Sequence, residues 1–366
     1  MQVSIEPPAF RRGGSFCLFF GKRLQPIRRW AIRYFIAFAG MTIGVLAAQN
    51  SFAQSTPQRA LLALSKHDHT LAIVDPETLK VVARAPVGPD PHEVIASSDG
   101  RMAYVSIYGF GRYHQISVID LVAQKALPDI DTGALLGPHG LAFADGKVWF
   151  TAEASKAVAR YDPASARIDW IMGTGQNRTH MIYVRGDGSE FYTTNVNSAT
   201  VSAFEQITPP PPAQLQKDWT QTVIAVGKGA EGFDVSPDGR ELWTGNAQDG
   251  TVSVIDIAAR RVVATLDAKV VGASRLKFTP DGKYVAISSL RSGDLVFYDA
   301  ATRKEFKRVP IGRGAAGILM DLVGDRVFVS CGPNNYVAVV DLKTFEVSGH
   351  VDVGVEPDGL AWAVRR

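Results

Sequence analysis

The chain has 366 residues, of which 46% are hydrophobic and 20% charged, and its 34 glycines and 20 prolines indicate many turns rather than long helices. Residues 1–53 hold seven of the 39 Lys and Arg residues and one of the 36 Asp and Glu residues, so the rest of the chain carries a net charge of −3. A nearly neutral body of this kind excludes the broad basic surface that binding to a nucleic-acid backbone requires.

The first 53 residues have the pattern of a signal peptide. Seven basic residues precede an apolar stretch from Tyr34 to Ala48, which at about 15 residues is shorter than the roughly 20 needed to span a bilayer. Small residues follow at Ser51-Phe52-Ala53. We therefore expect cleavage after Ala53 and a periplasmic or secreted protein without a membrane span.

The export signal leaves two alternatives open. A retained membrane anchor is one, although no charged stop-transfer segment follows the apolar stretch. The pair Arg28-Arg29 also leaves open whether export follows the general or the twin-arginine route. After cleavage Cys331 is the one cysteine left, and a single cysteine cannot form an intramolecular disulfide.

From residue 54 onward a unit of about 42 residues recurs to the end of the chain. The first strand of this unit runs into an Asp-Gly turn, which is typical of an antiparallel hairpin. The clearest copies of this strand and turn are PHEVIASSDG (91–100), THMIYVRGDG (179–188), AEGFDVSPDG (230–239) and ASRLKFTPDG (273–282).

The rest of each unit alternates between apolar and polar residues, as half-buried strands do. A second strand ends in small polar residues, for example YTTN (192–195) and WTGN (243–246), and a fourth strand is rich in valine. The third strand ends in an acidic residue in seven places: AIVD (72–75), SVID (117–120), ARYD (159–162), SAFE (202–205), SVID (253–256), VFYD (296–299) and AVVD (338–341). Seven third strands predict seven four-stranded sheets.

The two ends of the repeat region complement each other. The first unit, residues 60–88, has only three strands, and the last segment, PDGLAWAVRR (357–366), matches only a first strand. We therefore predict an all-β, seven-bladed β-propeller, one domain over residues 54–366, in which the C-terminal strand completes the N-terminal blade and closes the ring. A two-domain or open-solenoid arrangement would leave this complementarity unexplained.

These repeats resemble the YVTN family of β-propellers over nearly all of the chain after residue 53. The resemblance rests on the SPDG and TPDG turns (236–239 and 279–282), the YTTN and WTGN strand ends and the SVID strands. It implies the fold and says little about activity. One unit, GPHGLAFADGKVWFTAEASKAVARYDP (137–163), also resembles repeats of the streptogramin lyases.

One unit departs from the repeat. An insertion from Pro209 to Trp219 contains four consecutive prolines, which cannot pair within a sheet. We expect a stiff exposed loop there, between the third and fourth strands of the fourth blade.

In a propeller the first strand of each blade lines the central channel, so its entry residues form a ring around the channel mouth. Aligning the repeats gives the seven members of this ring: Asp358, His92, His139, His180, Glu231, Ser274 and Ala316. Three histidines in adjacent blades at one position are the strongest functional signal in the sequence. The alternative is that these histidines are structural. Solvated channel mouths often carry polar residues, and histidine there can form hydrogen bonds with backbone groups of neighbouring turns.

Imidazoles that converge with a carboxylate are suitable ligands for Zn²⁺ or a similar divalent ion. We expect a metal site with His92, His139 and His180 as ligands. Glu231 is expected as the fourth ligand or as a general base, and Asp358 as a residue that orients one imidazole.

Other polar residues receive more ordinary interpretations. His67 and His69 are expected in a solvated turn, and Cys331 as a small buried strand residue. Arg275, Asp234 and Lys277 interrupt the apolar pattern of the inner strands, and the sequence leaves open whether they line the channel or pair with one another.

Three functions fit these features. The first is an exported binding protein that holds a metal ion or small ligand, delivers it to a periplasmic partner and is similar to propeller-type zinc chaperones. The second is a metal-dependent lyase or lactonase, as the streptogramin-lyase resemblance implies, with His180 or His139 together with Glu231 in acid–base roles. The third is an interaction scaffold without chemistry at the mouth.

Overall fold

The computed structural model describes residues 54–211 and 217–366. The signal peptide and the cleavage site after Ala53 predicted from the sequence lie outside the described residues. No helix in the described ranges is long and apolar enough to cross a membrane.

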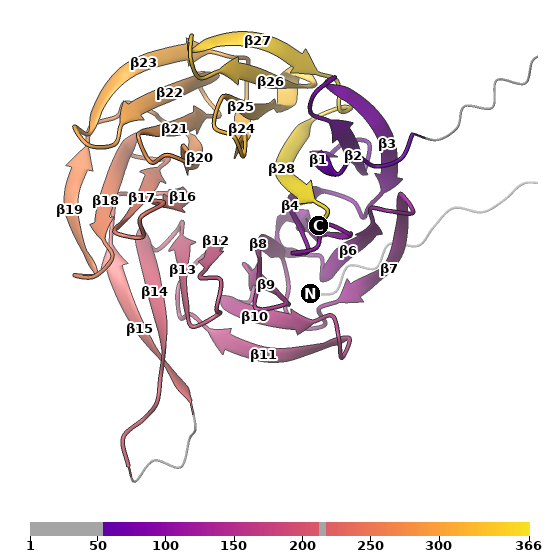
Figure 1. The fold of residues 1–366 in the computed structure, drawn as a ribbon. Helices are drawn as coiled ribbons and strands as arrows, with labels where there is room; N and C mark the ends of the chain where they lie inside the picture. The colour runs from indigo at the N-terminus through magenta and orange to yellow at the C-terminus, as the bar shows by residue number, and fades with distance from the viewer. Residues whose placement is uncertain (1–53, 212–216) are drawn as a thin grey trace, which may run out of the picture. The chain divides into compact units, whose positions relative to one another are not determined.

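Residues 54–366 form seven four-stranded antiparallel sheets in the part of the chain that the structure describes, and these sheets are arranged in a ring (Figure 1). The inner strands are β28 (Pro357–Val364), β4 (Pro91–Ala96), β8 (Pro138–Ala144), β12 (Thr179–Val184), β16 (Ala230–Val235), β20 (Ala273–Phe278) and β24 (Ala315–Met320). The second strands are β1 (Arg59–Ser65), β5 (Met102–Ile107), β9 (Lys147–Ala152), β13 (Glu190–Asn195), β17 (Glu241–Asn246), β21 (Tyr284–Ser289) and β25 (Arg326–Cys331).

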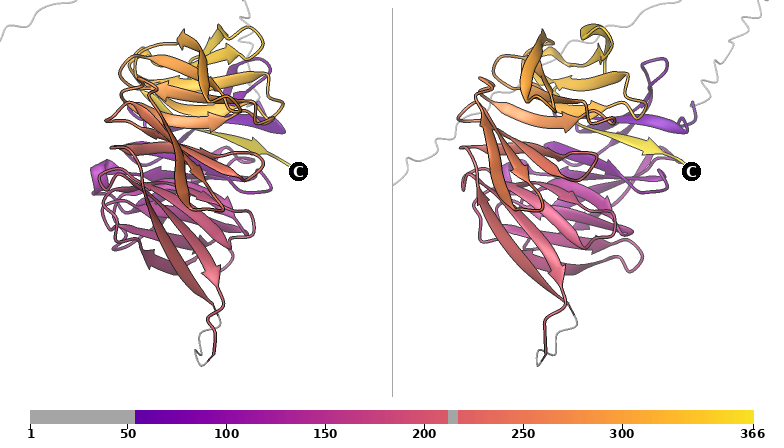
Figure 2. Two further views of the ribbon diagram at one scale, coloured as in Figure 1. Left: turned by 90° about the vertical axis from the view of Figure 1, so that its left-hand side faces the viewer. Right: turned by 60° about the vertical axis from the view of Figure 1, so that its left-hand side comes forward.

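The third and fourth strands complete each blade toward the rim of the ring (Figures 1 and 2). The third strands are β2 (Thr70–Asp75), β6 (Gln115–Asp120), β10 (Ala157–Asp162), β14 (Thr200–Ile207), β18 (Thr251–Asp256), β22 (Asp294–Asp299) and β26 (Tyr336–Asp341). The outer strands are β3 (Lys80–Pro86), β7 (Lys125–Asp131), β11 (Arg167–Gly173), β15 (Asp218–Ala225), β19 (Arg261–Leu266), β23 (Lys304–Pro310) and β27 (Glu346–Val351). The seven-bladed propeller predicted from the sequence is confirmed.

The ring closes as the repeat ends predicted. The C-terminal strand β28 pairs with β1 in an antiparallel register that places Leu61 opposite Trp362 and Ala63 opposite Leu360, and the sheet order is β28-β1-β2-β3. The last strand of the chain is thus the inner strand of the first blade. This arrangement covers an edge that either terminus would otherwise leave open.

Apolar side chains fill the space between neighbouring blades. Leu62 and Leu64 of β1 and Ile73 of β2 pack against Val105 and Ile119 of the next blade, and all five are fully buried. The second and third strands of each blade are covered on both faces, which explains their nearly continuous apolar runs.

The acidic residue that ends most third strands has a local role. Asp120 accepts hydrogen bonds from the backbone N–H groups of Val122 and Ala123, and Asp341 does the same for Lys343 and Thr344. A short carboxylate that caps its own turn is a recurrent turn-forming device. The repeated acid therefore reflects turn formation rather than a site.

The insertion lies between the third and fourth strands of its blade, as predicted, but it is shorter than the sequence suggested. Asp218 and Trp219 belong to β15, which pairs with β14 from Thr200 opposite Ala225 to Ile207 opposite Asp218 (Figure 1). Trp219 packs near Trp170 and Phe191, with ring centroids 5.4 Å and 5.0 Å away. This aromatic contact holds Trp219 in the sheet. The prediction that Trp219 belongs to the loop is therefore wrong.

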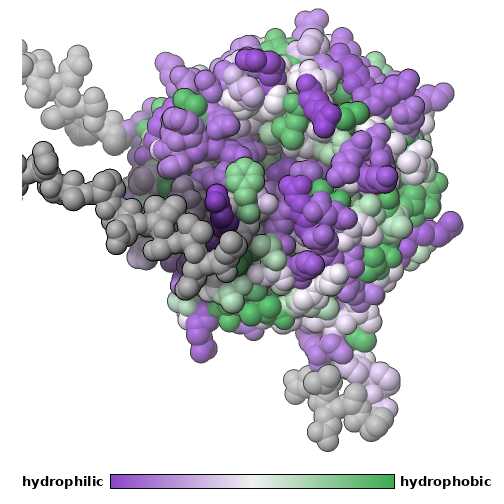
Figure 3. Space-filling view, turned by 180° about the vertical axis from the view of Figure 1, so that it is seen from behind, coloured by the Kyte–Doolittle hydropathy of each residue, from purple (hydrophilic) through white to green (hydrophobic). Residues whose placement is uncertain are grey.

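The face seen in Figure 3, behind the view of Figure 1, carries mainly hydrophilic side chains with apolar ones in separate, smaller groups.

Candidate metal centre

A cavity of about 400 Å³ lies at the N-terminal ends of the inner strands. All seven ring positions derived from the repeat alignment line it: Asp358, His92, His139, His180, Glu231, Ser274 and Ala316. The structure therefore brings together residues that are up to 266 positions apart in the chain, between His92 and Asp358.

The small polar residues near the ends of the second strands help to fix this ring. Thr151 donates from Oγ1 to the carbonyl oxygen of His180 at 2.6 Å and accepts from the N–H of Gly140, so it links two blades. Thr194 donates in the same way to the carbonyl of Glu231. The strand ends that mark the repeat in the sequence thus hold the backbone of the neighbouring ring residue.

Glycine after His139 lets two inner strands approach closely. A Cβ atom on Gly140 would lie 2.5 Å from the carbonyl oxygen of His180, a distance that a real side chain could not tolerate. As a result the imidazoles of His139 and His180 lie with centroids 3.9 Å apart and ring planes tilted by 36°, and the ring of His92 lies 5.0 Å from that of His139. Tyr108 packs edge-on against both His92 and His139.

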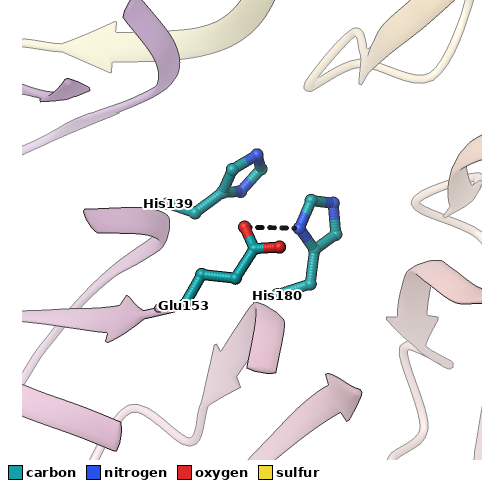
Figure 4. Close-up of side chains that lie close together, drawn as sticks. All are labelled: His139, Glu153 and His180. Atoms are coloured by element: carbon teal, nitrogen blue, oxygen red, sulfur yellow. Dashed lines mark hydrogen bonds and ion pairs between the residues drawn. The ribbon is translucent and has the colours of Figure 1, made fainter. Parts of the chain in front are cut away.

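His180 lies between two carboxylates. Its Nδ1 is 3.5 Å from Oε2 of Glu153, and its Nε2 is 3.2 Å from Oε1 of Glu231. Figure 4 shows the Glu153 carboxylate beside the imidazoles of His139 and His180. One ligand atom from each of these three residues lies within 4.8 Å of the others, which is close enough to hold a metal ion.

Two nitrogens in this cluster are buried without a hydrogen-bond partner in the described part of the chain: Nδ1 of His139 and Nε2 of His180. The contact of His180 with Glu231 is therefore close in distance but poorly directed for a hydrogen bond. Buried polar atoms normally have partners, so unpartnered imidazole nitrogens side by side are what a metal site offers.

His92 occupies a different environment. Its Nε2 is 3.1 Å from Asp90 and its Nδ1 is 3.5 Å from Asp358, whose carboxylate also lies 3.4 Å from Nζ of Lys66. The structure thus places Asp358 against one imidazole, where it is able to orient the ring.

The protonation of the buried imidazoles follows from their neighbours. Burial, together with the charges of His180 and His92, holds the pKa of His139 well below its usual value, so its ring is neutral near pH 7. Burial also acts to lower the pKa of His180, but the carboxylates of Glu231 and Glu153 outweigh it and raise that pKa. Against the opposing effect of burial, the charge of His180 lowers the pKa of Glu231 to about 2, so Glu231 is ionised.

Sequence reasoning missed three residues of the site: Glu153, Arg178 and Tyr108. The residue that follows each second strand forms another ring around the mouth, comprising Lys66, Tyr108, Glu153, Val196, Ala247, Leu290 and Gly332. The residue two places before each inner-ring position is glycine in four blades but Asp90, Arg178 and Glu356 in the others. The departure from glycine at the second position is the signal that could have identified Arg178, whereas the position of Tyr108 and Glu153 varies from blade to blade and carries no such signal.

The inner-strand charges fall into two pairs. Arg275 forms an ion pair with Glu93 of β4, on the other side of the channel, and Lys277 pairs with Asp234 at 3.1 Å. Beyond the Arg275–Glu93 pair lies a second cavity of about 350 Å³ with mainly apolar walls, including Phe143, Tyr183, Leu319 and Trp362. Arg275 lines both cavities and separates them.

The remaining sequence interpretations agree with the structure. The side chain of His67 is 70% exposed in a turn beside Asp68. Cys331 is fully buried in β25, and burial raises the pKa of its thiol to about 12. A thiol of this kind is unreactive at neutral pH, so Cys331 is a packing residue.

Comparison with protein families finds the cytochrome D1 haem domain, which matches residues 151–319. This range includes Glu153, Arg178, His180 and Glu231, and it covers slightly less than half of the chain. No curated protein sequence matches. The YVTN resemblance is not confirmed by these comparisons, whereas a relationship to β-propeller proteins is.

Solved structures share the fold at low sequence identity. A protein of unknown function from Desulfotomaculum acetoxidans has 12% identity and a TM-score of 0.68, over 84% of this chain and 99% of its own. A candidate 6-phosphogluconolactonase from Bacteroides uniformis has 14% identity and a TM-score of 0.68, over 84% and 100%. Dihydro-haem d1 dehydrogenase NirN, in a complex with its ligand DHE, has 17% identity and a TM-score of 0.59, over 82% of this chain and 65% of its own.

Proposed function

We propose that this protein is an exported metal-binding propeller that holds a divalent transition ion at the channel mouth, and that Zn²⁺ is the ion it favours. The observation that carries the proposal is the pair of buried nitrogens on the adjacent rings of His139 and His180 that have no hydrogen-bond partner among the described residues. Export rests on the sequence pattern of residues 1–53.

The charges around the mouth favour a cation. Six carboxylates lie at or directly behind the cavity wall, and three cationic side chains accompany them. The carboxylates are Asp90, Glu93, Glu153, Glu231, Glu356 and Asp358, and the cations are Lys66, Arg178 and Arg275. Imidazole nitrogens with carboxylates form a donor set that suits Zn²⁺ and its neighbours rather than Ca²⁺ or Mg²⁺.

Calorimetry and elemental analysis of the purified protein test this function. We expect one Zn²⁺ per chain, and we expect His139→Ala to abolish binding because it removes a ligand nitrogen. His114→Ala is the matched control, because His114 is half exposed and contacts only Asp131 among the described side chains. Wild-type protein that binds no divalent transition ion would refute the proposal.

A second candidate ligand is a metal-containing tetrapyrrole. The match to the cytochrome D1 haem domain over residues 151–319 favours it, as do the exposed side chains of Phe110 and Leu290 on the wall of the same cavity. Apolar side chains beside a histidine-rich floor suit a flat macrocycle whose metal is ligated from below. Titration with haemin, followed by absorption spectroscopy, separates this ligand from a free ion.

A further inference from the structure

Both carboxylate oxygens of Glu153 are already engaged. Oε1 accepts a hydrogen bond from Nε of Arg178, and Oε2 lies against Nδ1 of His180. Only 4% of the Glu153 side chain is exposed, and Glu153 is absent from the cavity wall that Arg178, His180 and Glu231 line. Although Glu153 is close enough to join a metal site, both of its oxygens already contact Arg178 or His180.

The opposite edge of the His180 ring faces that space. Its Nε2 finds no hydrogen bond among residues 54–211 and 217–366, and Glu231, 3.2 Å away, lines the cavity. A neutral imidazole has one protonated and one free nitrogen, so a proton held on Nδ1 leaves the lone pair on Nε2.

The backbone at Arg178 points to the same role. The equivalent position has a positive φ in all seven blades and is glycine in four of them, Gly137, Gly229, Gly272 and Gly314. Arg178 adopts a φ of 60°, a conformation that costs energy in any residue with a Cβ atom. Asp90 and Glu356 also place a charged side chain at this position, and Arg178 differs from them by its ion pair with the buried carboxylate of Glu153.

We propose that Arg178 and Glu153 form a positioning pair that holds the proton of His180 on Nδ1, so that Nε2, which lies beside Glu231, is left to ligate the metal. This assignment rests on the proposed metal-binding function. It makes Glu153 a positioning residue rather than a ligand. A carboxylate that orients a metal-binding histidine is a general means of raising metal affinity.

The tautomer of His180 is measurable without any metal. We expect nitrogen-15 NMR of the metal-free protein, recorded above the pH at which the same spectra show the His180 ring to lose its charge, to show the remaining proton on Nδ1. Glu153→Met removes the acceptor, so the proton should redistribute toward Nε2. Glu153→Gln keeps an acceptor oxygen and should retain the Nδ1 proton. A wild-type His180 with its proton on Nε2 would overturn the proposal, whether or not the protein binds metal.

Metal binding then separates positioning from ligation. We expect Glu153→Met and Arg178→Gly to weaken Zn²⁺ binding roughly 10- to 100-fold and Glu153→Gln to recover most of the affinity. Arg178→Gly installs the residue that four other blades have, so its backbone is suited to the site. Glu346→Gln is the control, because Glu346 is an exposed carboxylate on the outer strand β27 and does not line the cavity.

The spectrum of bound Co²⁺ shows which groups are ligands. At saturating Co²⁺, the Glu153 variants should give the wild-type visible spectrum, because the ligands are unchanged, whereas Glu231→Gln should alter it. A Glu153→Met spectrum that changes as the Glu231→Gln spectrum does would make Glu153 a ligand and overturn the positioning role. Wild-type protein that binds neither Zn²⁺ nor Co²⁺ would instead refute the proposed function, and the tautomer measurement would still decide the proposal.

Discussion

Two arcs of the same ring use equivalent backbone positions in different ways. On β4, β8 and β12 the mouth position carries His92, His139 and His180, whereas on β20 and β24 it carries Ser274 and Ala316. Both arcs have the same strand order and the same antiparallel pairing. The propeller therefore does not need an imidazole at this position.

The arcs also differ in how their buried polar groups are satisfied. On the β20–β24 arc, Arg275 pairs across the channel with Glu93 of β4, and Asp321, which follows β24, pairs with Arg326 and Arg59. On the histidine arc, imidazole nitrogens of His139 and His180 stay unpartnered among the described residues. Paired charges stabilise the ring, and unpartnered nitrogens at a cavity wall indicate a binding site.

The largest effect on stability is expected on the β20–β24 arc. Arg275→Ala should lower the free energy of unfolding by about 3–5 kcal/mol, because it leaves Glu93 buried without its partner. Chemical denaturation measures this loss, with Arg313→Ala, an exposed arginine of the same arc, as the control. A loss equal to that of the control would mean that the pair across the channel does not stabilise the ring.

Alanine substitutions at equivalent ring positions test whether the two arcs differ in metal binding. His180→Ala should weaken Zn²⁺ binding at least about 100-fold, or about 3 kcal/mol, because a ligand nitrogen is lost. Ser274→Ala, at the equivalent position, should leave the affinity within about twofold, because Ser274 is not one of the proposed ligands. Calorimetry measures both, and equal losses in the two variants would remove the distinction between the arcs.

A smaller effect concerns the pH dependence of stability. Burial alone would raise the pKa of Asp321, but the hydrogen bond from Arg326 and the charge of Arg59 lower it. The unfolded value is about 3.9, so the stabilisation is complete above that pH and is lost as the pH falls through the lower folded value. Asp321→Asn should cost about 1–2 kcal/mol at pH 7 and flatten the decline of stability below about pH 4. Urea denaturation at several pH values measures the free energy of unfolding. The same decline below about pH 4 in the wild type and in the variant would contradict this prediction.

The smallest effect separates the two candidate ligands. Phe110 is 76% exposed at the mouth, so Phe110→Ala should change stability by no more than about 0.5 kcal/mol and leave Zn²⁺ affinity unchanged. Haemin binding, if it uses this ring for stacking, should weaken by about 0.5–1.5 kcal/mol. Equal affinity for haemin in both proteins would remove Phe110 from the binding surface.

The sequence by itself determined the repeat, the number of blades and the closure by β28, because strand alternation and Asp-Gly turns act locally and recur in register. The same register identified His92, His139 and His180 as one ring. The tertiary structure alone decided that Glu153 and Arg178 reach His180, and that Arg275 pairs with Glu93 across the channel. Such contacts depend on side-chain direction and on the distance between blades, which no periodicity along a single chain encodes.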